Sequence, residues 1–125
     1  MSLQQIVEAA SRDDLFRTGE LEVHIDDGLV LAAGKALTLS VREFQLLCAL
    51  VASGGRIVSR GDLYQHVWGG GLLEGDRSID VYVRKLRVKL EQALPERRFI
   101  HTHVGFGYRF SDEPSHTVHN QPADG

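Results

Sequence analysis

The sequence has a single cysteine and no apolar run long enough to cross a membrane. Cys48 lies in the apolar run 46–51, so we expect a small buried side chain in a reduced, cytoplasmic setting. That run is far shorter than the roughly 20 residues that span a bilayer. Residues 1–6 contain neither a basic segment nor a long apolar stretch, so no signal peptide is predicted.

Residue sets for catalysis or metal binding are equally sparse. His101 and His103 have a spacing that can chelate a metal, and His116 and His119 form a second pair. No cysteine or convincing carboxylate completes either pair, so no metal site is expected. The Gly-Phe-Gly segment 105–107 precedes no helix, which argues against a dinucleotide-binding loop. We predict neither catalysis nor a cofactor.

The net charge of −3 hides a segregation of charge along a chain whose 125 residues suggest one domain. Residues 1–76 carry 6 Lys or Arg and 11 Asp or Glu, residues 77–110 carry 8 and 3, and residues 111–125 carry 0 and 3. The middle segment therefore has a net charge of +5, between segments of −5 and −3. Because binding responds to the local potential, residues 77–110 suit an anionic partner such as nucleic acid.

The same basic segment has the periodicity of a helix. Apolar residues recur at steps of four, three and four, as in a stripe buried against a core: Ile79, Val83, Leu86 and Leu90. At about 100° per residue, the opposite face holds Arg77, Val81, Arg84 and Lys85. A cationic face with a small apolar centre suits the DNA major groove, where Arg and Lys reach guanines or phosphates. A solvated basic helix with ion pairs is the alternative.

Short alternating runs before this helix predict strands at 15–17, 21–25, 29–31 and 36–38. In the second run Leu21, Val23 and Ile25 share one side, which we expect to be buried. Turns at Gly28 and Gly34 separate the later runs. The four segments predict a small antiparallel sheet.

Capping residues mark the starts of three helices. Ser40 and Glu43 form a capping box, and the helix they begin should end near residue 53. Ser59 begins a second helix that ends near Trp68, and Asp76 can cap the basic helix, which runs to about residue 93.

A hairpin should follow the helices, with strands at 99–104 and 108–110. Strands, three helices and a hairpin predict an α+β winged helix-turn-helix fold, with the third helix as the recognition helix. We expect a linker or disordered segment at 1–14, the winged-helix domain at 15–111 and a disordered tail at 112–125.

Five segments in order resemble the OmpR/PhoB-type effector domain of response regulators. Segment 37–47 resembles its L-T-x-x-E-F-x-L-L opening, and 55–63 its G-x-V-V-S-R-x-x-L segment. Val67-Trp68-Gly69 matches V-W-G, 77–90 resembles R-[ST]-V-D-V-H-I-x-x-L-R-x-K-L, and 100–110 matches I-x-T-V-R-G-x-G-Y-R-F. The resemblance covers about residues 15–111. It implies a sequence-specific, double-stranded DNA-binding transcription regulator, with the third helix in the major groove and the wing near the minor groove.

The resemblance also implies a contact set. Phosphate contacts are expected from Trp68, Arg77, Tyr82 and Arg87, and base contacts from Ser78, Val81, Arg84 and Lys85. Core packing is the alternative role for Trp68. An ion pair with Glu91 that braces the domain is the alternative for Arg87.

Three positions carry expectations of their own. Val104 occupies the wing position where the family often has a minor-groove arginine, so His103 or Arg109 is the candidate substitute. Lys85 reads bases without the bidentate fork of arginine. Asp80 is expected to pair with Arg84, four residues on, and orient it.

The resemblance implies partners beyond DNA. Relatives carry a phosphorylatable receiver domain ahead of this one, and residues 1–14 resemble an inter-domain linker, which favours a fragment over a stand-alone effector. Two copies are expected on direct repeats, and loop 69–75, with Leu72 and Leu73, is expected to touch RNA polymerase. A local plug under that loop is the alternative for the two leucines. A protein-interaction winged helix that lacks DNA binding is the alternative for the whole domain.

Overall fold

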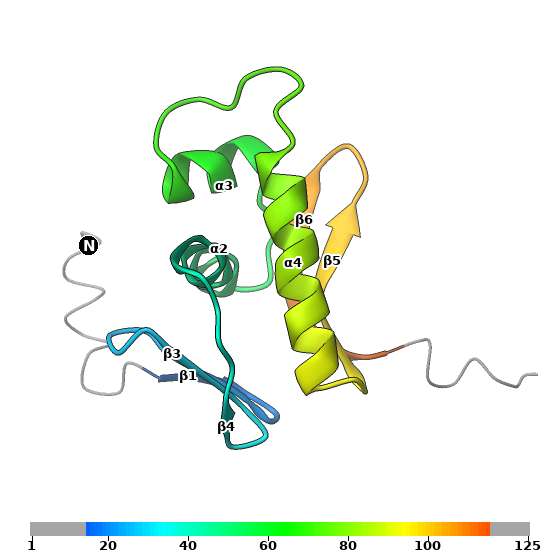
Figure 1. Ribbon diagram of the computed structural model, residues 1–125. Helices are drawn as coiled ribbons and strands as arrows, with labels where there is room; N and C mark the ends of the chain where they lie inside the picture. The colour runs from blue at the N-terminus through cyan, green and yellow to red at the C-terminus, as the bar shows by residue number, and fades with distance from the viewer. Residues whose placement is uncertain (1–14, 116–125) are drawn as a thin grey trace, which may run out of the picture.

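The computed structural model describes residues 15–115, so segments 1–14 and 116–125, with His116 and His119, lie outside the described residues. The elements of the described part, in chain order, are β1 (Leu15–Thr18), β2 (Leu21–His24), β3 (Leu29–Ala32), β4 (Lys35–Ala36), α2 (Val41–Ala52), α3 (Arg60–Val67), α4 (Ser78–Ala93), β5 (Arg97–His103) and β6 (Gly107–Pro114). Figure 1 shows the N-terminal sheet beside α2, and α4 alongside the β5–β6 hairpin. This order confirms the predicted α+β winged helix-turn-helix. None of the described helices has the length and apolarity needed to cross a membrane.

Strands β1 to β4 form the predicted antiparallel sheet, in that order. Leu21 and Val23 are fully buried, as the alternation predicts. Ile25, expected on the same buried side, is instead 41% exposed. The prediction was wrong there because β2 ends at His24 and the chain turns before β3 begins at Leu29.

The predicted starts of α2 and α3 are confirmed, whereas the N-cap position of α4 is held by Arg77 and not by Asp76. The Ser40 side chain accepts from the Glu43 amide, and the Glu43 carboxylate accepts from the Ser40 amide at 2.8 Å. Ser59 accepts from the Asp62 amide at the start of α3, which ends with Trp68 as its C-cap. Ahead of α4, Oδ1 of Asp76 accepts a 2.8 Å hydrogen bond from the Ser78 amide. Each bond satisfies an amide that the helix itself leaves without a partner.

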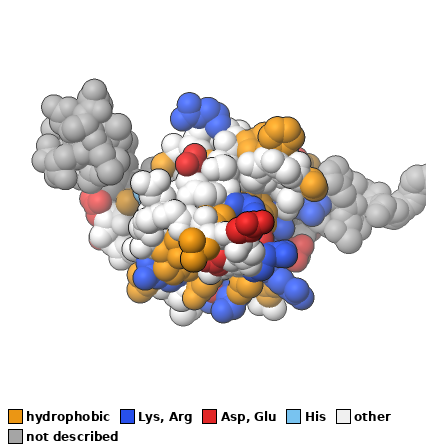
Figure 2. Space-filling view, turned by 90° about the horizontal axis from the view of Figure 1, so that it is seen from above, with side chains coloured by type: hydrophobic (Ala, Val, Ile, Leu, Met, Phe, Trp, Pro, Cys, Tyr) orange, Lys and Arg blue, Asp and Glu red, His pale blue; other side chains and the backbone are white. Residues whose placement is uncertain are grey.

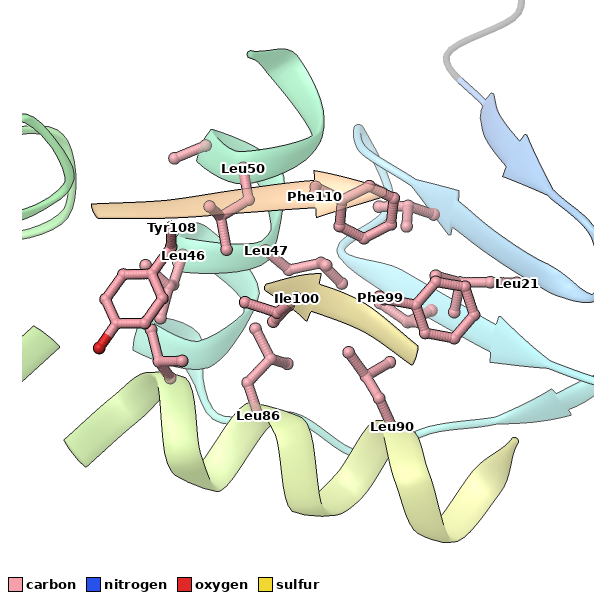
Figure 3. Close-up of a cluster of buried hydrophobic side chains, with 14 of the residues drawn as sticks. Leu21, Leu46, Leu47, Leu50, Leu86, Leu90, Phe99, Ile100, Tyr108 and Phe110 are labelled. Carbon is pink, nitrogen blue, oxygen red and sulfur yellow. The ribbon is translucent and has the colours of Figure 1, made fainter. Parts of the chain in front are cut away.

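Helices α2 and α4 enclose the core together with the hairpin. The predicted stripe of α4 is buried, with exposures of 3% or less at Ile79, Val83, Leu86 and Leu90. Figure 3 shows the side chains that meet there, from α2, α4, β5, β6 and β2: Leu46, Leu47, Leu50, Leu86, Leu90, Phe99, Ile100, Tyr108, Phe110 and Leu21. Helix α4 is therefore oriented by its buried apolar face, which leaves its basic face outward.

Strand β6 extends beyond the predicted end of the domain. Residues 112–114, expected to open a disordered tail, belong to β6 instead, in which Glu113 and Pro114 pair with Arg98 and Arg97 of β5. Asp112 accepts hydrogen bonds from Thr18 at 2.8 Å and from Arg97 at 2.7 Å. The predicted boundary at residue 111 was wrong. The contacts that hold Asp112 in the sheet come from residues far away in the sequence. The polar composition of the segment alone could not show them.

The hairpin is held against the segment between α2 and α3 by backbone contacts. The Val58 amide donates to the Tyr108 carbonyl at 2.8 Å, and the Tyr108 amide donates to the Val58 carbonyl at 2.9 Å. Gly107 has a φ of +141°, and a Cβ built on it would lie 2.0 Å from the Val58 carbonyl oxygen. Only glycine fits this approach.

A methyl group at position 107 should therefore destabilise the domain. We expect Gly107→Ala to lower the free energy of unfolding by roughly 3 kcal/mol or more, because it combines a backbone clash with a strained φ. Gly105 is the matched control, since its φ is +83° and nothing lies within 4 Å of its added Cβ. Gly105→Ala should cost only about 1 kcal/mol. Equal losses in denaturant unfolding would contradict the close approach.

Candidate nucleic-acid interface

The outward face of α4 carries the residues predicted for it. Arg77, Val81, Arg84 and Lys85 are all exposed, and Val81 is 45% exposed. Lys85 places its Nζ 4.8 Å from the centre of the Tyr82 ring, which is the reach of a cation–π contact. Helical spacing alone sets this arrangement, because the buried stripe fixes which residues face outward.

Aromatic rings join the end of α3 to α4. Trp68 stacks on Tyr64 at 5.2 Å between ring centres and meets Tyr82 edge-on at 5.3 Å. The Arg42 guanidinium lies 5.4 Å from the Trp68 ring. Trp68 is partly buried against the core, so the packing role considered for it is present. Its phosphate contact, like that of Tyr82, stays a prediction.

Asp80 has partners other than the one predicted. It pairs with Arg60 at 3.1 Å and with Arg77 at 3.0 Å, and it accepts a hydrogen bond from the Tyr108 hydroxyl. The expected pair with Arg84 was therefore wrong. Arg60 and Tyr108 come from α3 and β6, and the fold brings both donors to the Asp80 carboxylate. The side chain of Arg84 is exposed to solvent instead.

The surroundings shift both acids of this cluster. Burial raises the pKa of Asp80, but hydrogen bonds from Tyr108 and Arg77 and the charges of Arg60 and Arg77 outweigh it, so the pKa is lowered overall. Burial, together with the hydrogen bond and charge of Asp80, raises the pKa of Tyr108 to about 12. The carboxylate is thus kept ionised and the phenol kept protonated.

Two further predicted contacts are engaged within the domain. Ser78 donates its hydroxyl to Asp76 at 2.6 Å. Arg87 donates to the Ile100 carbonyl through Nε at 3.1 Å and Nη2 at 3.0 Å, and to the Thr102 hydroxyl at 2.6 Å. Arg87 therefore braces α4 against β5 rather than through an ion pair with Glu91. Whether Ser78 meets a base or Arg87 a phosphate stays a prediction.

The wing holds its cation away from its tip. Arg109 donates to His103 Nε2 at 3.1 Å and to Glu113 at 3.4 Å. Val104 is 88% exposed and Phe106 is 73% exposed. His103 and Arg109, the candidate substitutes for the family's arginine, thus bind each other. No group of three or more metal-ligating side chains occurs within residues 15–115.

An open groove of about 680 Å³ lies between the wing, the start of α3 and the loop before α4. Its lining includes Arg60, Arg77, Val104 and Phe106. Figure 2 shows the molecule from above, the end at which Figure 1 places the hairpin turn and the start of α4. Lys and Arg side chains lie among hydrophobic ones on that face. Sequence reasoning missed Arg60 and Tyr108, because both belong to this site only through contacts with Asp80, which is distant from them in the sequence.

Comparison with known proteins gives one consistent result. The family model described as "Transcriptional regulatory protein, C terminal" matches residues 34–110. The sensory transduction protein RegX3 of Mycolicibacterium smegmatis is 30% identical over 102 residues, which cover 82% of this chain and 45% of that protein. The phosphate regulon transcriptional regulatory protein PhoB of Escherichia coli is 39% identical over 82 residues, covering 66% of this chain and 35% of that protein. The chain spans less than half the length of either relative.

A solved structure agrees. The RstA DNA-binding domain of Klebsiella pneumoniae, crystallised in complex with the RstA box, matches with a TM-score of 0.71 at 30% identity. The match covers 78% of this chain and 96% of that domain.

The Asp80 cluster should make stability depend on acidity. The pKa of Asp80 in the folded domain lies below its usual value of 3.8. The ionised carboxylate therefore adds to the free energy of unfolding above that pH, and this stabilisation is lost as pH falls through the folded pKa. We expect Asp80→Asn to lower the unfolding free energy at neutral pH by about 1–3 kcal/mol. The difference from the wild type should shrink below about pH 4.

Asp62→Asn is the control, since Asp62 is exposed in the first turn of α3. Unfolding curves at several pH values measure both variants. A difference between Asp80→Asn and wild type that persists unchanged into acid would show that the charge of Asp80 is not what stabilises the cluster.

Proposed function

The chain belongs to the family of transcriptional regulatory protein C-terminal domains, of the OmpR/PhoB type, and from this premise we propose that it binds double-stranded DNA sequence-specifically as the effector domain of a two-component response regulator. The observation that carries the proposal is the exposed basic face of α4, held rigidly beside a hairpin wing. An α-helix fits the major groove, and a neighbouring hairpin can then reach the minor groove.

Base reading falls to the central part of that face. Arg84 and Lys85 are exposed and make no ion pair within the described residues, so both are available to guanine edges. Val81 lies beside them and can pack against a thymine methyl. Ser78 is the fourth base contact, provided that its hydroxyl leaves Asp76.

Phosphate contacts fall to the flanks of the helix. Arg77 precedes α4, and Trp68 and Tyr82 form one aromatic surface beside it. Arg87 lies on the other flank, against β5. Such contacts fix the position of the domain on the duplex without reading its sequence.

The longer protein implied by the relatives has further partners. We place a receiver domain ahead of this effector domain, because the chain spans only part of each relative. Two copies then bind direct repeats, one copy to each half-site.

Loop 69–75 is proposed as the contact with RNA polymerase. Leu73 is 75% exposed, which contradicts the alternative that it plugs the space beneath the loop. Leu72 is half-buried and lines the groove. The exposed Leu73 and the half-buried Leu72 beside it are available to a protein partner at the domain surface.

A protein-interaction domain without DNA binding is the second candidate, favoured by Val104 where the family often has an arginine. Salt dependence separates the two. If phosphates are bound, affinity for duplex DNA should fall by orders of magnitude between about 50 and 200 mM salt. Duplexes selected from a random pool supply the site for this measurement.

Substitutions of the base readers should relax sequence preference. We expect Arg84→Ala and Lys85→Ala each to cost about 1–3 kcal/mol on the selected site and to reduce discrimination against single-base variants. Lys35→Ala is the control, because Lys35 is exposed in β4 and lies outside the α4 face. Equal losses of affinity for every sequence would remove both residues from base reading.

Leu73→Ser should separate activation from binding. We expect promoter activation in a purified transcription assay to fall several-fold, while DNA affinity and the melting temperature stay unchanged. The reason is that the side chain is exposed and lies outside the α4 face. Unchanged activation would remove Leu73 from the polymerase contact, and a lowered melting temperature would restore the plug.

A further inference from the structure

The turn of the wing presents two large apolar side chains to solvent. Val104 and Phe106 are 88% and 73% exposed, on either side of Gly105. Neither belongs to the core cluster, so folding does not require them to be apolar. Exposed apolar side chains gathered at one projecting point mark a contact surface.

The described cations of the hairpin are directed elsewhere. Arg109 is bound to His103 and Glu113 on the hairpin itself. Arg97 and Arg98 pair with Pro114 and Glu113, at the opposite end of the hairpin from the turn. Among the described residues, the tip of the wing is therefore apolar, whereas a minor-groove arginine would make it cationic.

The position of this tip is fixed relative to α4. The Val58–Tyr108 hydrogen bonds and the close approach of Gly107 to Val58 hold the wing against the segment between α2 and α3. The groove beside the tip is also lined by Arg77 and Asp80, at the start of α4. The apolar tip thus continues the surface assigned to DNA rather than forming a separate one.

We propose that Val104 and Phe106 form an apolar wedge that packs into the minor groove of the bound duplex, against sugars and base edges. The inference rests on the proposed DNA binding. The minor groove is about 6 Å wide, enough for a narrow tip, and apolar side chains are known to wedge between base steps there. The tip and the start of α4 line the same groove, which favours the duplex bound by α4 as the partner of the tip.

The wedge has a consequence that an arginine would not have. Apolar packing releases no counterions, so the wing contributes affinity without adding to the salt dependence. It also favours sites whose flanking steps unstack easily, such as TA and CA/TG. Part of the specificity then comes from the deformability of DNA that α4 does not contact.

Two variants test the wedge on a duplex selected by the wild-type domain. Phe106→Ser and Val104→Ser should each weaken binding, with a loss of about tenfold for Phe106→Ser. The slope of log affinity against log salt should stay unchanged. Hydroxyl-radical protection of the sugars beside the α4 site should disappear in Phe106→Ser. Val104→Arg should instead steepen the salt slope by about 1.

Leu73→Ser is the matched control, because Leu73 is an equally exposed apolar residue outside the wing. It should leave affinity and footprint unchanged, and melting curves should show all the variants folded. Wild-type affinity and footprint in both wing variants would overturn the wedge and leave the proposed function standing. A wild-type domain that binds no duplex with salt sensitivity would overturn the proposed function, and the wedge with it.

Discussion

The close approach of Gly107 to Val58 is the constraint on which the arrangement of the site depends. It allows the two backbone hydrogen bonds between Val58 and Tyr108, at 2.8 and 2.9 Å. Those bonds join the connection between α2 and α3 to β6 through an isolated β-bridge. Tyr108 is thereby turned so that its hydroxyl reaches Asp80 on α4. One backbone contact thus sets the wing, α3 and the recognition helix in a fixed relation, which two neighbouring DNA grooves require.

The ion pairs of Asp80 fix two arginine side chains beside these elements. Arg60 is tied twice, to Asp80 and to the Asp76 carbonyl at 3.0 Å. Arg77 is tied to Asp80 alone among the described residues, and its side chain is 73% exposed. Exposed ion pairs contribute only about 0–1 kcal/mol, so Arg77 can exchange the carboxylate for a phosphate at small cost. The cluster therefore keeps Arg77 ordered near the duplex while leaving its charge available.

Local patterns in the sequence were enough to predict most of the fold. The spacing of Ile79, Val83, Leu86 and Leu90 was enough to orient α4, since a buried stripe determines the opposite face. The capping box of Ser40 and Glu43 was enough to predict the start of α2, because both partners lie within one helical turn. The exposure of Arg84 and Lys85 followed from the stripe alone.

What the sequence could not provide were pairings between distant segments. The partners of Asp80 come from α3 and β6, and those of Asp112 from β1 and β5. A carboxylate near a neighbouring arginine suggests a helical ion pair, as was expected for Arg84. Only the packed fold shows which cation is nearer. The same limit applied to the end of the domain, where charged residues in β6 resemble a solvated tail until their partners are known.

Arg87 shows why bracing and DNA binding need not be alternatives. Its Nε and Nη2 donate to Ile100 and Thr102 of β5. A guanidinium has five N–H donors, so the two on Nη1 remain for a phosphate. A side chain held in this way loses less rotamer entropy on binding than an unrestrained one. We infer a division of labour: cations fixed by the fold suit the invariant phosphate backbone, whereas the exposed Arg84 and Lys85 keep the freedom to adapt to bases. That freedom also means that each base contact must offset the entropy lost when its side chain is ordered, so only a well-matched base adds net affinity.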